Sequence, residues 1–190
     1  THQCTPGLSS PNGENIALAS ADNTVRPWNV KSGSLDIIGR HSKQVITVPF
    51  SPTGLHIAFG CSDGVVELNV GPSVHEPGPI FKHHIEEVRS LAYSLDGRQV
   101  TSGSQDLTIY NGVYYLRYLP SAEREQVLQG NSSSVNCVAF SPNGNQLASG
   151  SADKSIVLWN IELGERVPVI RDLVDAALSI AFSPDGQRIV

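Results

Sequence analysis

The chain has 190 residues, of which 39% are hydrophobic and 16% are charged, and its formal net charge is −5. Nucleic-acid binding needs a clustered basic patch, and the basic residues here are scattered singly, so no nucleic-acid partner is expected. The longest apolar runs have the length of strands, which argues against a membrane-spanning helix and predicts no membrane association.

The chain contains no methionine, and its first residues, THQCTPGLSS, lack the charged and apolar regions of a signal peptide. We therefore expect a piece or processed form of a longer protein, located in the cytoplasm, with a secreted form left open. Cys4, Cys61 and Cys137 lie far apart and have no close Cys/His pairs of the kind that metal sites use. They are expected to be small buried strand residues in a reducing compartment.

A four-residue turn motif recurs five times along the chain. It reads Ser-Pro-Asn-Gly or a close variant at 10–13, 51–54, 94–97, 141–144 and 183–186, with spacings of 41, 43, 47 and 42 residues. Proline presets φ at the second position of such a turn, and glycine is favoured at the fourth. A period in this range is typical of repeat folds in which each repeat is one supersecondary unit.

Each repeat predicts four short antiparallel strands. In chain order the predicted strands are 4–9, 15–20, 24–30 and 34–39; 45–51, 55–61, 65–70 and 78–83; 88–94, 98–104, 107–112 and 124–129; 135–141, 146–151, 155–161 and 165–171. A fifth repeat begins at Ala177 with one strand and a turn. The units of this single repeat domain, 1–190, are placed at about 1–41, 42–84, 85–131 and 132–173, with the start of a fifth at 174–190.

Residues 135–161, VNCVAFSPNGNQLASGSADKSIVLWNI, resemble a WD40 repeat. The resemblance covers nearly the whole chain and is good at 10–30 as well. It implies an all-β fold, a WD40-type β-propeller of four-stranded antiparallel blades, with about four blades in this chain. Arrays that contain Trp-Asn, as at Trp28-Asn29 and Trp159-Asn160, are similar to those of fungal and bacterial signalling NTPases, so the chain looks fungal-like.

The number of repeats leaves the closure of the ring open. Propellers use about four to eight blades, and WD40 rings resemble the seven-bladed kind most often. The chain is then part of a longer array, or two chains complete one ring of about eight blades as a homodimer, or four blades close a small ring.

An aspartate follows each of the first four turn serines by twelve residues. In the turn between second and third strands, an aspartate can accept hydrogen bonds from backbone N–H groups and fix the turn. One aspartate per blade cannot converge on a single substrate atom, which favours a structural role. The WD40 resemblance adds a network with a second-strand serine, a third-strand tryptophan and a histidine ten residues before the turn. The residues expected in these turns and networks are Asp22, Asp63, Asp106, Asp153, His41, His84, Trp28, Trp159 and Ser149.

The network is expected to be uneven between repeats. Asn131 stands in the histidine position of the fourth repeat, and Asn69 or Leu68 stands where the second repeat should have tryptophan. These departures predict blades of unequal stability. At the position of the family's final Asp, the sequence is expected to hold asparagine in every repeat: Asn29, Asn69, Asn111 and Asn160.

The loops between blades and the turns between second and third strands share one rim of a propeller. On that rim the sequence places a mixed, mildly polar set of residues that suits a peptide or a partner domain. The candidate binding residues are Lys43, Gln44, Glu86 and Lys154. The first hypothesis is therefore a non-catalytic protein-interaction scaffold with an unidentified protein or peptide partner.

The alternative is a carbohydrate-binding, lectin-like propeller. Its candidate sugar-stacking residues are Tyr114, Tyr115 and Tyr118, in the most unusual local stretch of the chain. His83 and His84 are adjacent in a predicted strand and point to opposite faces, so they are not expected to share a metal ion. No catalytic residue, cofactor site or metal site is predicted.

Overall fold

The structure, a computed structural model, describes residues 9–20, 22–35, 39–70, 78–113, 125–170 and 173–190. The regular structure of these residues consists of β-strands. None of the described segments forms a helix long and apolar enough to span a membrane.

The strands form four antiparallel sheets in chain order. The first sheet contains β1 (Asn15–Ala19), β2 (Thr24–Asn29) and β3 (Gly39–Arg40). The second contains β4 (Val45–Thr47), β5 (His56–Cys61), β6 (Val66–Val70) and β7 (Ile80–Phe81). The third contains β8 (Val88–Tyr93), β9 (Gln99–Ser104), β10 (Thr108–Val113) and β11 (Glu125–Gln129). The fourth contains β12 (Val135–Phe140), β13 (Gln146–Ser151), β14 (Ile156–Asn160) and β15 (Glu165–Ile170).

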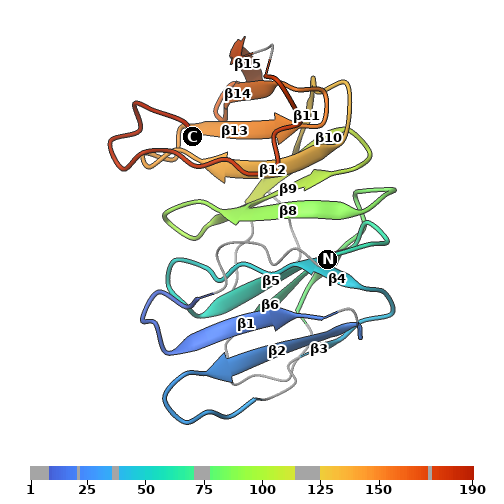
Figure 1. The fold of residues 1–190 in the computed structure, drawn as a ribbon, viewed down its shortest axis with the longest axis vertical. Helices are drawn as coiled ribbons and strands as arrows, with labels where there is room; N and C mark the ends of the chain where they lie inside the picture. Colours follow the sequence, from blue (N-terminus) through green and yellow to red (C-terminus); the bar gives the residue numbers. More distant parts are fainter. Residues whose placement is uncertain (1–8, 21, 36–38, 71–77, 114–124, 171–172) are drawn as a thin grey trace.

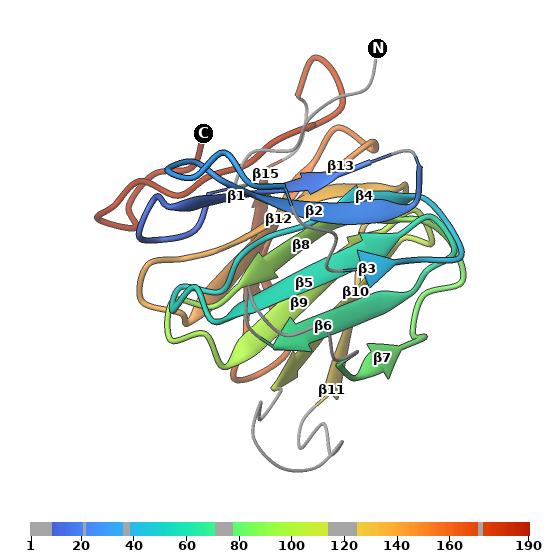
Figure 2. The ribbon, with the colours of Figure 1, turned by 90° about the horizontal axis from the view of Figure 1, so that it is seen from below.

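The four sheets stack along the long axis of the molecule. Figure 1 shows the first sheet at the bottom and the fourth at the top, with β1, β4, β8 and β12 following one another along the stack. Figure 2 looks along this stack and shows the sheets fanned out beneath one another. Because the first and fourth sheets lie at opposite ends, the four sheets do not close into a ring. The predicted all-β architecture of four-stranded blades is confirmed, and a closed ring of four blades is not formed.

The core consists of apolar layers between neighbouring sheets. Ala17 and Val25 of the first sheet pack with Phe59 and other residues of the second. Equivalent layers join the second sheet to the third and the third to the fourth, where Trp159 is fully buried. Since a single sheet cannot bury both of its faces, each sheet depends on its neighbours for stability.

Glycines in the second strands allow the sheets to approach closely. A Cβ added at Gly103 would lie 2.7 Å from Val135 Cγ1 and 3.0 Å from Val138 Cγ1 of the next sheet. Gly60 would meet Val88 in the same way, at 2.7 Å. These distances are shorter than an ordinary van der Waals contact. The sheets can therefore lie this close together only because glycine has no side chain at these positions.

The strand predictions are confirmed for most of the described chain, with shorter strands beside prolines. β4 ends at Thr47 rather than at residue 51, since Pro49 has no N–H to continue the ladder. β7 is limited to Ile80–Phe81, next to Pro79. The predicted strand 4–9 and the middle of 34–39 fall mostly outside the described residues.

The fifth repeat packs against the fourth sheet. The side-chain amide of Asn136 on β12 donates to the carbonyl oxygen of Ala177 at 3.0 Å, and Ile180 joins the core cluster of that sheet. Ala181 and Val190, on the two sides of the turn, exchange two backbone hydrogen bonds. The predicted turn is present, whereas the predicted strand is reduced to an isolated bridge between Phe182 and Ile189.

Candidate interaction rim

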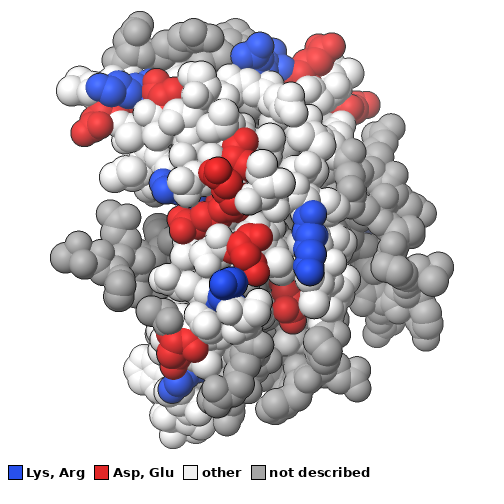
Figure 3. Space-filling model, turned by 90° about the vertical axis from the view of Figure 1, so that its right-hand side faces the viewer, with Lys and Arg blue, Asp and Glu red and all other residues white. Residues whose placement is uncertain are grey.

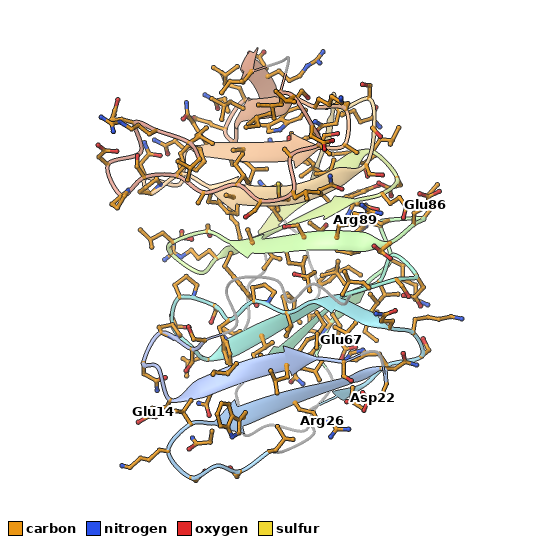
Figure 4. All side chains as sticks on the ribbon, viewed as in Figure 1. Glu14, Asp22, Arg26, Glu67, Glu86 and Arg89 are labelled. Atoms are coloured by element: carbon orange, nitrogen blue, oxygen red, sulfur yellow. The ribbon has the colours of Figure 1, made fainter. Side chains whose placement is uncertain are left out.

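The inter-sheet loops and the turns between second and third strands are tied together by backbone hydrogen bonds. Ser62 N–H donates to Gln44 carbonyl oxygen at 2.9 Å, and Gln105 N–H donates to Glu87 carbonyl oxygen at 2.9 Å. Figure 4 shows Asp22 and Glu86 at the same edge of the stack and Glu14 at the opposite edge. We call the edge formed by these loops and turns the rim.

A residue with positive φ closes each of these turns. Asn23, Leu107 and Lys154 have φ of 65°, 73° and 66°, and Gly64 has φ of 81° at the same place in the second sheet. The preceding aspartate stabilises this conformation, because its side chain accepts the backbone N–H that follows. Asp106 Oδ1 accepts from Thr108 N–H at 3.0 Å.

In the third sheet the aspartate and the histidine form a buried network. His84 Nδ1 lies 2.9 Å from Asp106 Oδ2, and His84 Nε2 lies 2.7 Å from Ser102 Oγ. The neutral tautomer with its proton on Nδ1 satisfies both contacts, since it donates to the carboxylate and accepts from the hydroxyl. Asp106 Oδ2 also accepts from the N–H of Ile85, which fixes the incoming loop to the turn.

The ionisation of this pair follows from burial and hydrogen bonding. Burial lowers the pKa of His84 below its ordinary 6.5, although the Asp106 carboxylate opposes the shift. The pKa of Asp106 is lowered as well: burial acts to raise it, and hydrogen bonds from Thr108, the charge of His84 and the N–H of Ile85 together outweigh burial. At neutral pH the pair is therefore a neutral imidazole beside a carboxylate.

The fourth sheet carries a different version of the network. Trp159 Nε1 donates to Ser149 Oγ at 2.9 Å, and that hydroxyl donates to Asn131 Oδ1 at 3.1 Å. Asp153 is not bonded to Asn131; its Oδ2 accepts from the N–H of Ser132 at 2.7 Å. The side chain of Asn131 is shorter than that of a histidine. In this sheet the backbone N–H of Ser132 links the inter-sheet loop to the Asp153 turn instead.

The second sheet departs furthest from the expected pairing. His41 Nδ1 lies 3.3 Å from Glu67 Oε2, rather than at the predicted partner Asp63. Asp63 Oδ1 accepts a long bond, 3.4 Å, from Val65 N–H. The buried Nε2 of His41 finds no hydrogen-bond partner among the described residues.

In the first sheet Asp22 binds its own strand. Its side chain accepts from Thr24 and from Arg26, whose Nη2 lies 2.7 Å from Oδ2. Hydrogen bonds from Thr24 and Ser20 are the main reason why the pKa of Asp22 falls to about 2. Trp28 is 39% exposed, and no hydrogen bond joins it to this turn in the described chain. The expectation that Trp28 belongs to the network is therefore not met, since its side chain lies on the open face of the first sheet.

Three hydroxyl side chains belong to the networks in addition to the residues that the family pattern predicts. Thr24, Thr108 and Ser155 each donate a hydroxyl to the aspartate two residues earlier. The spacing Asp-x-Thr or Asp-x-Ser in the sequence could have revealed them.

The four asparagines do not share one position, contrary to expectation. Asn160 pairs with Gln146, and Asn29 with the equivalent Asn15. Asn69 pairs with Ile57, which is the position of the tryptophans. Asn111 lies a further residue inward, and Gly112 occupies the tryptophan position of the third sheet. The residue 18 positions after the turn serine is Trp28, Asn69, Gly112 or Trp159, so the repeats differ there in residue type and not in length.

The candidate rim residues Lys43, Gln44, Glu86 and Lys154 are all exposed. Figure 3 looks onto this edge and shows acidic and basic side chains side by side, with acidic ones gathered along the middle. Lys154 differs from the others, because its amine donates to the Val174 carbonyl oxygen at 3.0 Å. A partner would have to compete with that bond.

The residues of the carbohydrate-binding alternative are not among those that the structure describes. Tyr114, Tyr115 and Tyr118 lie outside the described residues. In the described part of the chain, no group of three His, Cys, Asp or Glu side chains is arranged to hold a metal ion. His83 stacks between Phe81 and Tyr110, with ring centroids 5.7 and 4.9 Å away.

Comparisons with known proteins agree with this geometry. The family model "WD domain, G-beta repeat" matches residues 75–110 and 122–160. The chain is 22% identical to cilia- and flagella-associated protein 57 of Mus musculus, 27% to telomerase protein component 1 of Rattus norvegicus and 29% to THO complex subunit 3 of Arabidopsis thaliana. These matches cover 92%, 99% and 92% of the chain, which spans 13%, 7% and 53% of the respective relatives.

Proposed function

Because this chain is a WD40-repeat protein, we propose that it is a non-catalytic interaction scaffold that binds a partner protein or peptide on its rim. The observation that carries the proposal is the rim itself. Backbone hydrogen bonds hold its loops against its turns, so exposed side chains such as Lys43 and Glu86 stand on a rigid support. The name of THO complex subunit 3 describes that relative as a member of a complex, in line with a scaffold.

The charge pattern of the rim favours a protein partner over a polyanion. It carries both acidic and basic side chains, with the acidic ones gathered along the middle, and the formal net charge of the chain is −5. Mixed rim charges select a partner with a complementary pattern and affect association rates more than affinity. The cytoplasmic location and the kinship with fungal signalling NTPases stay predictions.

The test is a comparison of captured proteins between charge-swapped variants. The rim variant combines Lys43→Glu with Glu86→Lys. The control combines Lys31→Glu with Glu14→Lys, exposed residues at the opposite edge, where Val30 N–H donates to the Glu14 carbonyl oxygen. Each protein is immobilised, exposed to the same cell extract, and its captured proteins are quantified by mass spectrometry. We expect the rim variant to lose proteins that the wild type and the control retain. Identical capture by all three would refute rim binding.

We also propose that two copies of the chain complete one ring. The outer face of the first sheet exposes Leu18, Trp28 and Leu35, which are apolar and lack a covering sheet in the described chain. At the other end of the stack, Val174 and Leu178 are exposed. Burial of such surfaces against each other would supply the apolar contacts that every internal sheet already has.

Light scattering during size-exclusion chromatography tests the dimer. A mass near twice the 20.3 kDa of the chain supports it, and Trp28→Glu should reduce the mass to that of one chain. Lys31→Glu, which is outside the apolar face, is the control. A wild-type mass of one chain at micromolar concentration would exclude the dimer and leave rim binding unaffected.

A further inference from the structure

The layer between the third and fourth sheets contains a row of polar side chains, some of them at positions where the other layers hold apolar residues. We call these side chains, Gln99, Thr101, Asn111 and Gln126, the polar row. At this position the second and third strands pair Ala17 with Pro27, Ala58 with Leu68, and Ala148 with Leu158. In the third sheet the pair is Thr101 with Asn111, and both side chains are buried. The other three repeats therefore show that this position ordinarily holds a pair of apolar residues.

The polar row extends across the third sheet. Thr101 Oγ1 donates to Asn111 Oδ1 at 2.7 Å, and Asn111 Nδ2 donates to Gln99 Oε1 at 3.2 Å. On the fourth strand Asn111 is paired with Gln126, whereas Leu158 in the fourth sheet is paired with Val167. Gln126 Oε1 is buried and accepts no hydrogen bond within the described residues. A buried acceptor without a donor is costly, which makes this row unusual as a purely structural feature.

The row opens into a cleft of about 330 Å³ between the third and fourth sheets. A second depression of about 430 Å³ adjoins it and shares Gln99, Gly144 and Asn145 with it. Both lie beside the Ser-Pro turns, at the edge opposite to the rim. The side chains that line the first cleft and carry the argument are Gln99, Asn111, Gln126, Asn145, Asn160 and Ile161.

The chemistry of this lining selects a ligand class. Five of its side chains are carboxamides, each of which offers both donors and an acceptor. Lys and Arg are missing from the described lining, and Glu162 and Asp96 are its acidic members, so an anion is disfavoured. Ile161 is the one aliphatic side chain in the described lining of the first cleft. A neutral molecule with many hydroxyl groups matches this set of donors and acceptors.

We propose that the cleft between the third and fourth sheets binds a neutral saccharide, with one sugar unit in each of its two compartments. Sugar hydroxyls bond the carboxamide groups of Gln99, Asn145 and Asn160 that line the cleft, and a shift of the Gln126 side chain on binding lets a hydroxyl donate to its buried Oε1. The site is separate from the proposed rim and does not depend on rim binding.

The test uses cellobiose, lactose and N,N′-diacetylchitobiose as probes, with the neutral tripeptide N-acetyl-Gln-Asn-Gln-amide for comparison. Each is titrated into the full chain while the side-chain NH₂ signals of Asn and Gln are followed by NMR. We expect at least one disaccharide to shift the signals of Gln126 and Asn111 at millimolar concentration. If no disaccharide shifts them, or the tripeptide alone does, the saccharide proposal is wrong.

Two variants assign the binding to this cleft. The double variant Asn111→Leu with Gln126→Val installs the residues that the fourth sheet holds at these positions, so we expect it to fold and to melt at a higher temperature. It should weaken disaccharide binding at least about tenfold. Asn145→Trp blocks the entrance without altering the buried row and should have the same effect on binding. Unchanged affinity in either folded variant would overturn the assignment.

Discussion

At the scale of single residues, the stability of each rim turn depends on the hydrogen bonds that its aspartate accepts. The Asp106 carboxylate accepts hydrogen bonds from Thr108 and Ile85 and from the ring of His84. It therefore joins a turn, a loop and a strand at one point. Among the described residues, Asp63 accepts one long bond of 3.4 Å from a backbone N–H, so the same residue type stabilises the second sheet less there.

The His84 contacts predict a pH-dependent contribution to stability. Because the pKa of His84 is below 6.5 in the folded chain, the unfolded chain binds its proton first as pH falls. The stabilisation is fully present above pH 6.5 and is lost as pH drops toward the lower folded pKa. Replacing His84 by Asn, the residue of the fourth repeat, should cost about 1–3 kcal/mol at pH 7.5.

Chemical denaturation of wild type and His84→Asn at several pH values measures this contribution. The difference between their free energies of unfolding should shrink as the pH is lowered below 6.5. Taking the difference removes the effect of His56, whose pKa is also lowered by burial. A difference that stays constant from neutral pH to the acid range would show that His84 titrates alike in both states.

At the scale of elements, sheet spacing is set by small residues in the second strands. Gly60, Gly103 and Gly150 occupy equivalent places, and each would bring a Cβ within 2.9 Å of the following strand or loop. The first sheet has Ala19 at this place, facing β4, which is only three residues long. Close packing is thus required at the second, third and fourth sheets, in the last case against the fifth repeat.

Gly103→Ala tests this spacing. The added methyl group would overlap Val135 and Val138, and we expect a loss of about 1–3 kcal/mol in the free energy of unfolding. Ala19→Gly, the reverse change at the equivalent position, should cost less than about 1 kcal/mol. Thermal and urea denaturation of the two variants would decide. Equal losses for both would mean that the glycine position does not control sheet packing.

Sequence patterns predicted the strands well and the polar contacts less well. The turn motif and the alternation of apolar residues locate β8, β9, β12 and β13 within one residue of their ends. Hydrogen-bond partners depend on which side chain each repeat holds at a given position, because the second and third strands pair in the same register in all four sheets. Glu67 replaces Asp63 beside His41, and Asn111 faces the fourth sheet instead of ending a strand. The partner of His41 does not follow from the sequence. The position of Asn111 does, because it comes 17 residues after Ser94, whereas Trp28 and Trp159 come 18 residues after their turn serines.

At the scale of the whole molecule, four unequal sheets form an open stack with two different edges. The rim carries charged loops, and the edge of the Ser-Pro turns carries the amide-lined cleft. The networks are most complete in the third and fourth sheets, where Trp159 and His84 are buried. The uneven stability that the sequence predicts would then place the more stable half toward the C-terminal sheets.

The central claim is that the rim is the partner-binding surface. Hydrogen–deuterium exchange of the chain, alone and bound to a protein captured by the wild type and lost by the rim variant, tests it most directly. We predict slower exchange in the loops 41–44, 82–87 and 130–134, and unchanged exchange at the turns 51–54, 94–97 and 141–144. Protection confined to those turns, with none on the rim loops, would contradict the claim.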